Sequence, residues 1–454
     1  MSSKVTFAFD NNPLGVYYAG QVISGTAELI TERPKTIRSI FITVNGFVET
    51  RWQEDVEKPG TDGKPIKIVE THTTTEIYYS SDKYVYGQSG GSPLELPKGK
   101  YVFPFQAAIP LNAPTSFNGM HGQIKHEVTL TIDRAVRYNN IFKQCFTVIL
   151  PYDLNQQREN LQPQHRVEEK TFWWGSLFGG KPMIMDVSTS YSGYVPGQKI
   201  QFKILLDNQS EVQCQDVKVR LFKNVSYRAN SGEEQLKKTE ARIADKHCGE
   251  VLKHNKAEFK EFLIVPPTTP TTQSPHDPIK VSYTLRFIAK TFRLHGGGDL
   301  VVNFPIVIGT VPLIGTTDDQ GLAVHTPLRP PIFQEDVNNE QFEANTFKPR
   351  YPVFFQNALL QNGEGNCATS NIPSLYPNVA NASKLSLPNI GPNPIPAAAA
   401  SNPPYPTKTN APTATKMNTG NGDGAFEVLG FSIPPDYQPT ASAPAAASSD
   451  IGWK

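Results

Sequence analysis

The stretches that decide the fold are Tyr17-Tyr18-Ala19-Gly20-Gln21 and Tyr194-Val195-Pro196-Gly197-Gln198. They begin 177 residues apart (194 − 17), and the same offset carries the apolar alternation of 40–44 onto that of 217–221. Residues two apart on a β-strand share a face, so this match preserves the buried face of the strand as well as its spacing. The repeat indicates two copies of one strand-rich unit.

A further match lies near the end of each copy. Residues 124–130 align with 279–285 at an offset of 155 (279 − 124), so the first copy contains about 22 extra residues before this point (177 − 155). The polar stretch 54–99 can accommodate them. Because two separate matches keep their order and their phase, a chance similarity between unrelated strands is a poor explanation.

The same pattern gives the fold class and the domain boundaries. Short alternating runs rich in Val, Ile and Thr, separated by Gly, Pro, Asn and Asp, are typical of half-buried strands. We expect an all-β protein with two tandem immunoglobulin-like β-sandwich domains. The expected boundaries are 1–155 for the first sandwich, 156–179 for a hinge or linker, and 180–315 for the second sandwich.

The composition changes after residue 315. Nineteen of the 39 prolines fall in the last 139 residues (454 − 315), and this region has eleven acidic and seven basic side chains, a net charge of −4. Runs such as PNPIPAAAASNPPYP carry too little apolar surface to offset the entropy that ordering would cost. The sequence predicts that 316–454 is a largely disordered, proline-rich tail.

Charge and cysteine usage argue against several classes of function. The formal net charge of the chain is +1, without the basic patch that nucleic-acid binding requires. Its four cysteines stand far apart and form no CxxC pair, so we expect reduced thiols, no metal and no cofactor. The first residues have no apolar leader segment, and Ser2 stands where myristoylation needs glycine. A cytoplasmic protein is the expectation.

No catalytic motif stands out, and the tempting features have simpler explanations. The sequence lacks HExxH, GxSxG and P-loop patterns, so we expect no enzyme. Gly296-Gly297-Gly298-Asp299 lies between two strand patterns and predicts a hairpin loop rather than a phosphate cradle. Asp133-Arg134 predicts an ion pair at a strand end. Cys248 is expected to be an ordinary exposed or half-buried cysteine, and the alternative is a reactive thiol next to His247. Trp173 and Trp174 near the domain junction fit either packing between the domains or a loop that touches a membrane.

The ordered motifs resemble the arrestin family, most closely its α-arrestin (arrestin-domain-containing) branch. The residues that carry the resemblance are Leu96-Pro97-x-Gly99, Phe103-Pro104-Phe105, Ile109-Pro110, Ala113-Pro114-Thr115-Ser116-Phe117, Ile132-Asp133-Arg134, the stretch 194–198 and Pro305 to Leu313. Together they cover about residues 1–315. The resemblance implies two arrestin-like sandwiches and an adaptor rather than a catalyst, one that gathers membrane cargo and ubiquitin ligases.

One departure from the family matters. Visual and β-arrestins place a basic pair just after the first strand to sense receptor phosphates, whereas this chain has Phe9-Asp10-Asn11-Asn12-Pro13 there. The acidic member of their buried polar core has no obvious match either, because Gly20-Gln21-Val22 occupies that segment. The sequence therefore gives no support for release of a polar lock by phosphate.

The tail carries a readable binding motif, Pro434-Pro435-Asp436-Tyr437. In a PPxY element the two prolines pre-form a polyproline II turn, which lowers the cost of ordering on binding. The prolines stack in the aromatic groove of a WW domain, and the tyrosine fills a second pocket. Pro434, Pro435 and Tyr437 are the expected WW-binding residues. The resemblance to α-arrestins implies that the WW domain belongs to a HECT ubiquitin ligase.

Four other tail sites each lack one feature of this motif. They are Pro330-Pro331-Ile332-Phe333, Lys348-Pro349-Arg350-Tyr351, Pro373-Ser374-Leu375-Tyr376 and Asn402-Pro403-Pro404-Tyr405. As weak WW sites, the residues that would bind are Pro330, Pro331, Phe333, Pro349, Tyr351, Pro373, Tyr376, Pro403 and Tyr405. Several weak sites could add avidity, and the alternative is that they are spacers.

The expected function is a cytoplasmic adaptor that joins membrane-protein cargo to a WW-domain HECT ligase. Its cargo would be a receptor or a transporter, and it would be recruited to the plasma membrane and endosomes through that cargo for ubiquitination, endocytosis and sorting. The alternative is an arrestin-like trafficking scaffold that works without a ligase, as coat or retromer subunits do.

Overall fold

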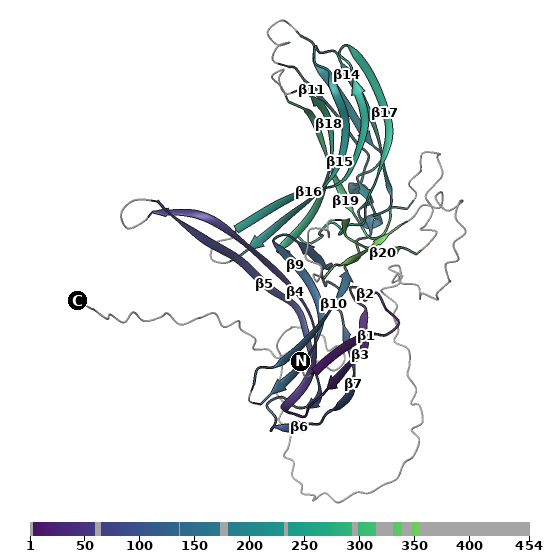
Figure 1. Ribbon diagram of the computed structural model, residues 1–454. Coiled ribbons are helices and arrows are strands. Elements are labelled where there is room, and N and C mark those ends of the chain that lie inside the picture. Colours follow the sequence, from purple (N-terminus) through teal and green to yellow (C-terminus); the bar gives the residue numbers. More distant parts are fainter. Residues whose placement is uncertain are drawn as a thin grey trace, which may run out of the picture. The chain divides into compact units, whose positions relative to one another are not determined.

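The computed structural model describes residues 3–59, 65–135, 137–172, 180–230, 235–292, 298–314, 330–337 and 347–354. Two β-sandwiches follow one another along the chain, as expected (Figure 1). A separate two-stranded sheet lies later in the sequence. Within the described residues, no helix is both long and apolar enough to cross a lipid bilayer.

The first sandwich packs a three-stranded sheet against a seven-stranded one. The smaller sheet has the order β1-β3-β7, with β1 at Ser3–Phe9, β3 at Val22–Thr31 and β7 at Gly99–Ala108. The larger sheet has the order β2-β10-β9-β4-β5, with β2 at Val16–Tyr18, β10 at Asn140–Ile149, β9 at Gly122–Arg134, β4 at Lys35–Pro59 and β5 at Pro65–Gly87. Two short strands complete it: β6 (Leu94–Leu96) pairs with β4, and β8 (Phe117–Gly119) pairs with β9.

The second sandwich repeats this plan. One sheet has the order β11-β12-β14-β17, with β11 at Gln164–Lys170, β12 at Met183–Thr189, β14 at Lys199–Asn208 and β17 at Asn255–Ile264. The other has the order β13-β19-β18-β15-β16, with β13 at Gly193–Tyr194, β19 at Leu300–Ile308, β18 at Ile279–Thr291, β15 at Cys214–Ala229 and β16 at Gln235–Val251. Strands β4 and β15 are equivalent, as are β9 and β18, so the internal repeat is confirmed.

The repeated Tyr-x-x-Gly-Gln motif builds the same turn in both copies. Gly20 and Gly197 have φ values of +87° and +91°, which lie in the left-handed region that favours glycine. The Gln21 side chain accepts a hydrogen bond from the Tyr18 amide at 2.8 Å, and Gln198 does the same for Val195 at 3.0 Å. Each turn leads out of a short strand that runs parallel to its neighbour, β2 beside β10 and β13 beside β19. The motif thus fixes one edge of each larger sheet.

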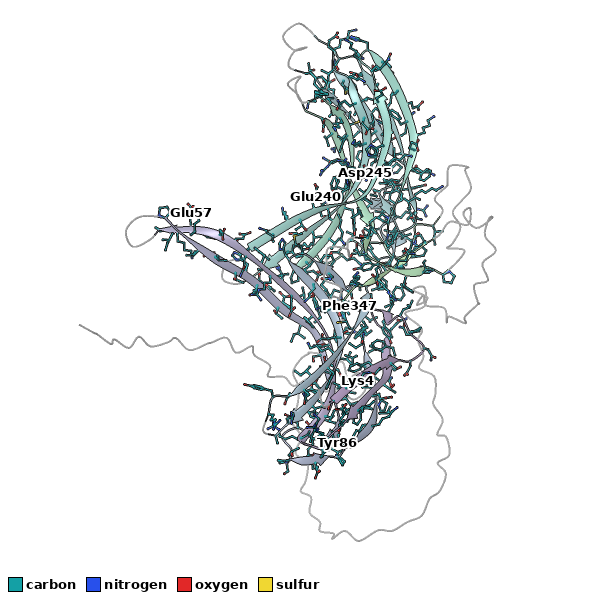
Figure 2. All side chains as sticks on the ribbon, in the orientation of Figure 1. Lys4, Glu57, Tyr86, Glu240, Asp245 and Phe347 are labelled. Atoms are coloured by element: carbon teal, nitrogen blue, oxygen red, sulfur yellow. The ribbon has the colours of Figure 1, made fainter. Side chains whose placement is uncertain are left out.

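The extra residues of the first copy lie largely where they were expected. Strands β4 and β5 have 25 and 23 residues, whereas the equivalent β15 and β16 have 16 and 17. The long β4–β5 hairpin runs beside β16, and Glu57 lies near its end (Figures 1 and 2). Trp52 of β4 is 4% exposed because it packs into the core of the second sandwich together with Val48, Phe117 and Ile124. The two sandwiches therefore share buried apolar surface.

Two expected boundaries need correction. The hinge expected over 156–179 contains β11, which pairs with β12 along its whole length. Its sequence, QHRVEEK, does not indicate a strand, because most side chains of β11 are exposed to solvent on both faces and no apolar alternation results. The tail expected over 316–454 contains β20 (Ile332–Glu335) and β21 (Arg350–Val353), which pair with each other. Proline suits such edge positions, and Pro352 lies within β21.

The connection between the two sandwiches is hydrogen-bonded to the segment that follows β19, the last strand of the second sandwich. A 3-10 helix, η1 (Leu154–Asn160), follows the first sandwich. The Tyr152 amide donates to the Thr310 hydroxyl at 2.7 Å, and the Asn155 side-chain amide donates to the Pro312 carbonyl at 2.9 Å. Buried polar backbone groups are costly when unpaired. These bonds therefore hold the segment that enters the second sandwich against the segment that leaves it.

Candidate functional site

The most unusual site lies where both sandwiches meet the C-terminal hairpin, which we define as residues 330–337 and 347–354 with strands β20 and β21. The hairpin is bonded to the second sandwich through the Phe354 amide, which donates to the Pro196 carbonyl at 2.9 Å. It is bonded to the first sandwich through the Asn118 side chain, which donates to the Phe347 carbonyl at 3.1 Å (Phe347 is labelled in Figure 2). The Arg350 amide also donates to the Thr147 hydroxyl at 3.2 Å. The hairpin therefore bridges the two sandwiches.

A buried ion pair lies at the centre of this three-way junction. Lys223 of β15 donates to Asp336 of the C-terminal hairpin at 2.6 Å, and the two side chains are 4% and 5% exposed. The ammonium group also lies 5.2 Å from the centre of the Phe117 ring, which the first sandwich contributes. Removing one partner of such a pair leaves an uncompensated buried charge and costs about 3–5 kcal/mol. The pair therefore ties the C-terminal hairpin strongly to β15.

A network of hydroxyl groups extends the ion pair. The Thr269 hydroxyl lies 3.1 Å from Asp336 Oδ2 and 3.0 Å from the Tyr351 hydroxyl oxygen, and its single hydrogen can serve one of them at a time. The Tyr351 hydroxyl donates to the Ser116 carbonyl of the first sandwich at 2.9 Å. Burial raises the pKa of Tyr351 well above its usual value, and the nearby Asp336 carboxylate adds to the shift. The tyrosine therefore stays neutral and can donate this bond.

A second set of contacts joins the sandwiches away from the C-terminal hairpin. The Thr50 hydroxyl donates to the Arg228 carbonyl at 2.7 Å, and Lys237 pairs with Glu54 at 2.7 Å. These contacts connect the β4–β5 hairpin to β15 and β16, so the junction at Lys223 is not the sole link between the sandwiches.

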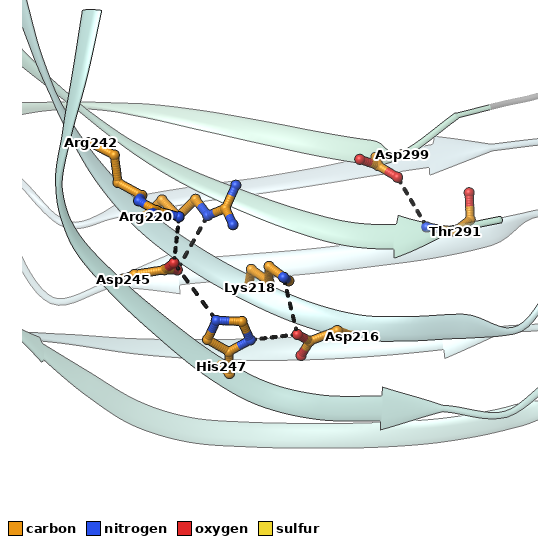
Figure 3. Close-up of polar contacts among 8 residues, drawn as sticks. All are labelled: Asp216, Lys218, Arg220, Arg242, Asp245, His247, Thr291 and Asp299. Atoms are coloured by element: carbon orange, nitrogen blue, oxygen red, sulfur yellow. Dashed lines mark hydrogen bonds and ion pairs between the residues drawn. The ribbon is translucent and has the colours of Figure 1, made fainter. Parts of the chain in front are cut away.

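The outer face of β15 and β16 carries many charges, and those drawn in Figure 3 are paired. His247 Nδ1 lies 2.6 Å from Asp216, and Asp245 accepts from Arg220 at 3.2 Å and from Arg242 at 2.9 Å. Exposed pairs of this kind add little stability. Among the residues described, no group of three or more His, Cys, Asp or Glu side chains could hold a metal ion. This face therefore shows an ordinary solvated sheet.

Three smaller expectations can be compared with the structure. Burial raises the pKa of Cys248 to about 11, so its thiol is a poor nucleophile, in agreement with the reading of an ordinary half-buried cysteine. Asp133 pairs with Arg38 at 2.7 Å rather than with its neighbour Arg134, because neighbouring residues on a strand point to opposite faces. Asp299 precedes β19 and accepts a hydrogen bond from the Thr291 amide at the end of β18, and these two strands pair antiparallel as the hairpin prediction requires (Figure 3). Gly296 and Gly297 lie outside the described residues.

The structure changes the status of two weak WW sites. Pro330, Pro331 and Phe333 lie in the first arm of the C-terminal hairpin, and Pro349 and Tyr351 lie in the second. Phe333 packs near Tyr18 of the first sandwich, and Tyr351 is 1% exposed. In the folded C-terminal hairpin the Tyr351 ring is not available to a WW pocket, which is a correction to the expectation of an accessible tail site.

The other predicted sites lie outside the described residues. They are Pro434, Pro435 and Tyr437 of the full motif, and Pro373, Tyr376, Pro403 and Tyr405 of the weak ones. Trp173 and Trp174 also lie outside, whereas the adjacent Phe172 is buried in the core of the second sandwich. All these sites stay predictions.

Sequence reasoning missed the ion pair, although half of its signal was present. The alternation of β15 places Val217, Val219, Leu221 and Val225 on the core side, and Lys223 falls in the same phase. A lysine at an inward position needs a buried partner, because an isolated buried ammonium is very unfavourable. The partner, Asp336, lies 113 residues away in a segment whose composition suggested disorder, so its identity could not be read from the sequence.

Comparisons with known proteins agree with this architecture. Residues 5–155 match the N-terminal domain of arrestin (or S-antigen), and residues 180–313 match its C-terminal domain. Arrestin domain-containing protein 17 of Caenorhabditis elegans is 26% identical over 312 residues, which cover 66% of this chain and 69% of the relative. Arrestin domain-containing protein 1 of Mus musculus is 27% identical over 298 residues, which cover 65% and 62%. Arrestin domain-containing protein 4 of Mus musculus is 24% identical over 363 residues, which cover 76% and 84%.

The matched domains, the repeated sandwich and these relatives agree with one another. The match to arrestin domain-containing protein 1 spans less than two thirds of that relative, so it carries over the fold and the family but no partner. The chain belongs to the arrestin family, in its arrestin-domain-containing (α-arrestin) branch.

Proposed function

We propose that this protein is a trafficking adaptor that links membrane-protein cargo to a WW-domain HECT ubiquitin ligase. The two sandwiches hold the cytoplasmic part of a receptor or transporter, and the tail holds the ligase. The ligase then ubiquitinates the cargo and directs it to endosomes. In this proposal the protein resides in the cytoplasm and reaches the plasma membrane and endosomes through its cargo.

The observation that carries the proposal is the pairing of an arrestin body with the motif Pro434-Pro435-Asp436-Tyr437. The body belongs to a family of non-enzymatic adaptors, and among the described residues the charged clusters are ion pairs rather than a catalytic arrangement. The motif contains both prolines and the tyrosine that a WW domain recognises. Together they give one surface for cargo and a separate element for the ligase.

The burial of Tyr351 strengthens the case for the full motif as the main ligase site. Five tail sites resemble a WW ligand, and two of them fold into the C-terminal hairpin. Of the remaining three, only the site at 434–437 has every feature of the motif. We therefore expect that Tyr437 accounts for most of the binding in the resting protein.

The test is a pulldown of full-length protein with a tandem WW-domain fragment of a HECT ligase. Tyr437→Ala should abolish most of the binding, because the tyrosine pocket is left empty. The matched control is Tyr405→Ala, which removes a tyrosine from a proline-rich tail site that lacks the first proline of the motif and should bind as the wild type does. Undiminished binding by Tyr437→Ala would remove the proposed mechanism.

The second candidate is a trafficking scaffold that works without a ligase. It is favoured by the finding that part of the supposed tail, the C-terminal hairpin, serves the folded body. A deletion must therefore begin after Phe354 to leave the body intact. Deletion of 355–454 leaves cargo turnover unchanged if the scaffold function is correct, and slows turnover if the ligase adaptor is correct.

A further inference from the structure

The second arm of the C-terminal hairpin contains a residue with two incompatible uses. Lys348-Pro349-Arg350-Tyr351 presents a proline and a tyrosine at the spacing of the last three positions of a PPxY motif. In the structure, however, the Tyr351 ring is buried and its hydroxyl is bonded between Ser116 and Thr269. One side chain cannot fill the junction and a WW pocket at the same time.

We propose that the junction and a WW domain compete for Tyr351, so that the C-terminal hairpin is a concealed second ligase site. In the closed state, Tyr351 stabilises the junction between the sandwiches. In the open state, the arm leaves the junction, and Pro349 and Tyr351 enter the aromatic groove of a WW domain. This inference rests on the proposed function, because it supposes that the partner is a WW-domain ligase.

The contacts of the C-terminal hairpin keep the closed state dominant. Tyr351, Val353 and Phe354 are all buried at the junction, so each would expose a large apolar group on opening. Opening also separates Asp336 from Lys223, which lie 2.6 Å apart. The apparent affinity of a WW domain free in solution is therefore weak, because only the open fraction of the protein can bind it.

The full motif can hold a ligase close to the C-terminal hairpin, whereas a WW domain free in solution is not held there. Tyr351 and Tyr437 are 86 residues apart (437 − 351). A tether of that many residues reaches at most about 280 Å when fully extended, so a ligase bound at 434–437 can present a second WW domain to the C-terminal hairpin. Binding of the second WW domain to the C-terminal hairpin is then intramolecular. Its effective concentration can raise the overall affinity by a factor of about 10²–10⁴. A tandem WW ligase can therefore open the hairpin where a single WW domain does not.

Opening would also change the relation between the two sandwiches. The closed hairpin is bonded to Asn118 and Thr147 on one side and to Pro196 and Lys223 on the other. These bridges are lost when the arm leaves, while the contacts between β4–β5 and β15–β16 remain. Binding of the ligase and the arrangement of the sandwiches are therefore coupled, and the coupling acts in both directions.

The test isolates the concealed site by removing the main one. In a full-length Tyr437→Ala background, Asp336→Asn leaves Lys223 as an uncompensated buried cation and favours the open state by about 10²–10⁴-fold. A tandem WW fragment should then bind the double variant at least tenfold more tightly than the Tyr437→Ala parent. Adding Tyr351→Ala should abolish the gain. Hydrogen exchange over 330–354 reports whether the hairpin has opened.

Two controls keep the result interpretable. Glu258→Gln, which breaks the exposed pair with Lys203, should change neither hydrogen exchange nor binding. Lys223→Met with Asp336→Leu replaces the buried pair by apolar groups and should close the hairpin again and conceal the site. If Asp336→Asn does not fold, the Gly197→Ala variant described below opens the same arm by a different route.

The outcomes separate this inference from the proposed function. An open hairpin that gains no WW binding would overturn the inference, as would equal binding with the hairpin closed. Neither result bears on Tyr437, because its contribution is measured separately, by comparing WW binding of the wild type with that of Tyr437→Ala. Conversely, loss of the Tyr437 effect would remove the proposed function while a gain that depends on Tyr351 could still be observed.

Discussion

The repeated turn offers a matched pair of substitutions, Gly20→Ala and Gly197→Ala. Both glycines have a φ near +90°, so alanine at either position costs about 1–2 kcal/mol of backbone strain. The difference lies in what the new methyl group meets. At Gly20 it meets the end of the Leu111 side chain, which is 82% exposed and free to move, whereas at Gly197 it overlaps the backbone carbonyl of Phe354.

The extra cost at Gly197 follows from the contacts that Phe354 loses. Its amide would no longer donate to the Pro196 carbonyl, a loss of about 0.5–1.5 kcal/mol. Its ring is 8% exposed, and leaving the junction would cost about a further 1.5–3 kcal/mol. Gly197→Ala should therefore destabilise the protein by about 2–4.5 kcal/mol more than Gly20→Ala does.

The assay is urea unfolding of the full-length variants combined with limited proteolysis of the C-terminal hairpin. Gly197→Ala should speed cleavage within 347–354, and Gly20→Ala should leave that cleavage rate unchanged. Equal destabilisation by the two substitutions, with equal protection of 347–354, would refute the reasoning that the second turn anchors the hairpin.

Three further results are expected. Asp336→Asn should lower the free energy of unfolding by about 3–5 kcal/mol and Glu258→Gln by under about 1 kcal/mol, and equal losses in urea unfolding would contradict the burial argument. Burial lowers the pKa of His126 from 6.5 to about 4, so the unfolded chain binds a proton that the folded one does not, and about 3 kcal/mol of stability is lost as the pH falls from 6.5 to 4. His126→Asn should flatten that part of the pH–stability curve, and an unchanged slope would assign it to other groups. A variant that retains Cys248 as its only cysteine should react with iodoacetamide about 100-fold more slowly at pH 7.5 than a free thiol, because its pKa is raised to about 11, and an ordinary rate would show an exposed thiol.

Sequence reasoning succeeded where a pattern is local or repeated. The Tyr-x-x-Gly-Gln turn, the alternation of β4 and β15, and the extra length of the first copy were all readable, because each depends on residues close together in the chain or on a comparison of the two copies. Edge strand β11 was missed, since its side chains are exposed or half-buried on both faces and its sequence has no apolar alternation.

The junction was out of reach for a different reason. Lys223 falls at an inward position of β15, but its partner Asp336 lies 113 residues away, next to a strand of only four residues. The C-terminal hairpin folds because the two sandwiches already provide a surface for Tyr351 and Val353, which no local propensity can reveal. Long-range pairing of this kind depends on the tertiary structure, and the sequence showed one half of the pair without the other.

In the proposed function, one end of this protein gathers cargo while the other recruits a ligase. Proximity labelling in cells tests it most directly, with full-length protein compared with Pro435→Ala/Tyr437→Ala. The account predicts that HECT ligases disappear from the labelled proteins of the double variant while membrane receptors or transporters remain. Retention of the ligases at the wild-type level, or loss of ligases and cargo together, would contradict it.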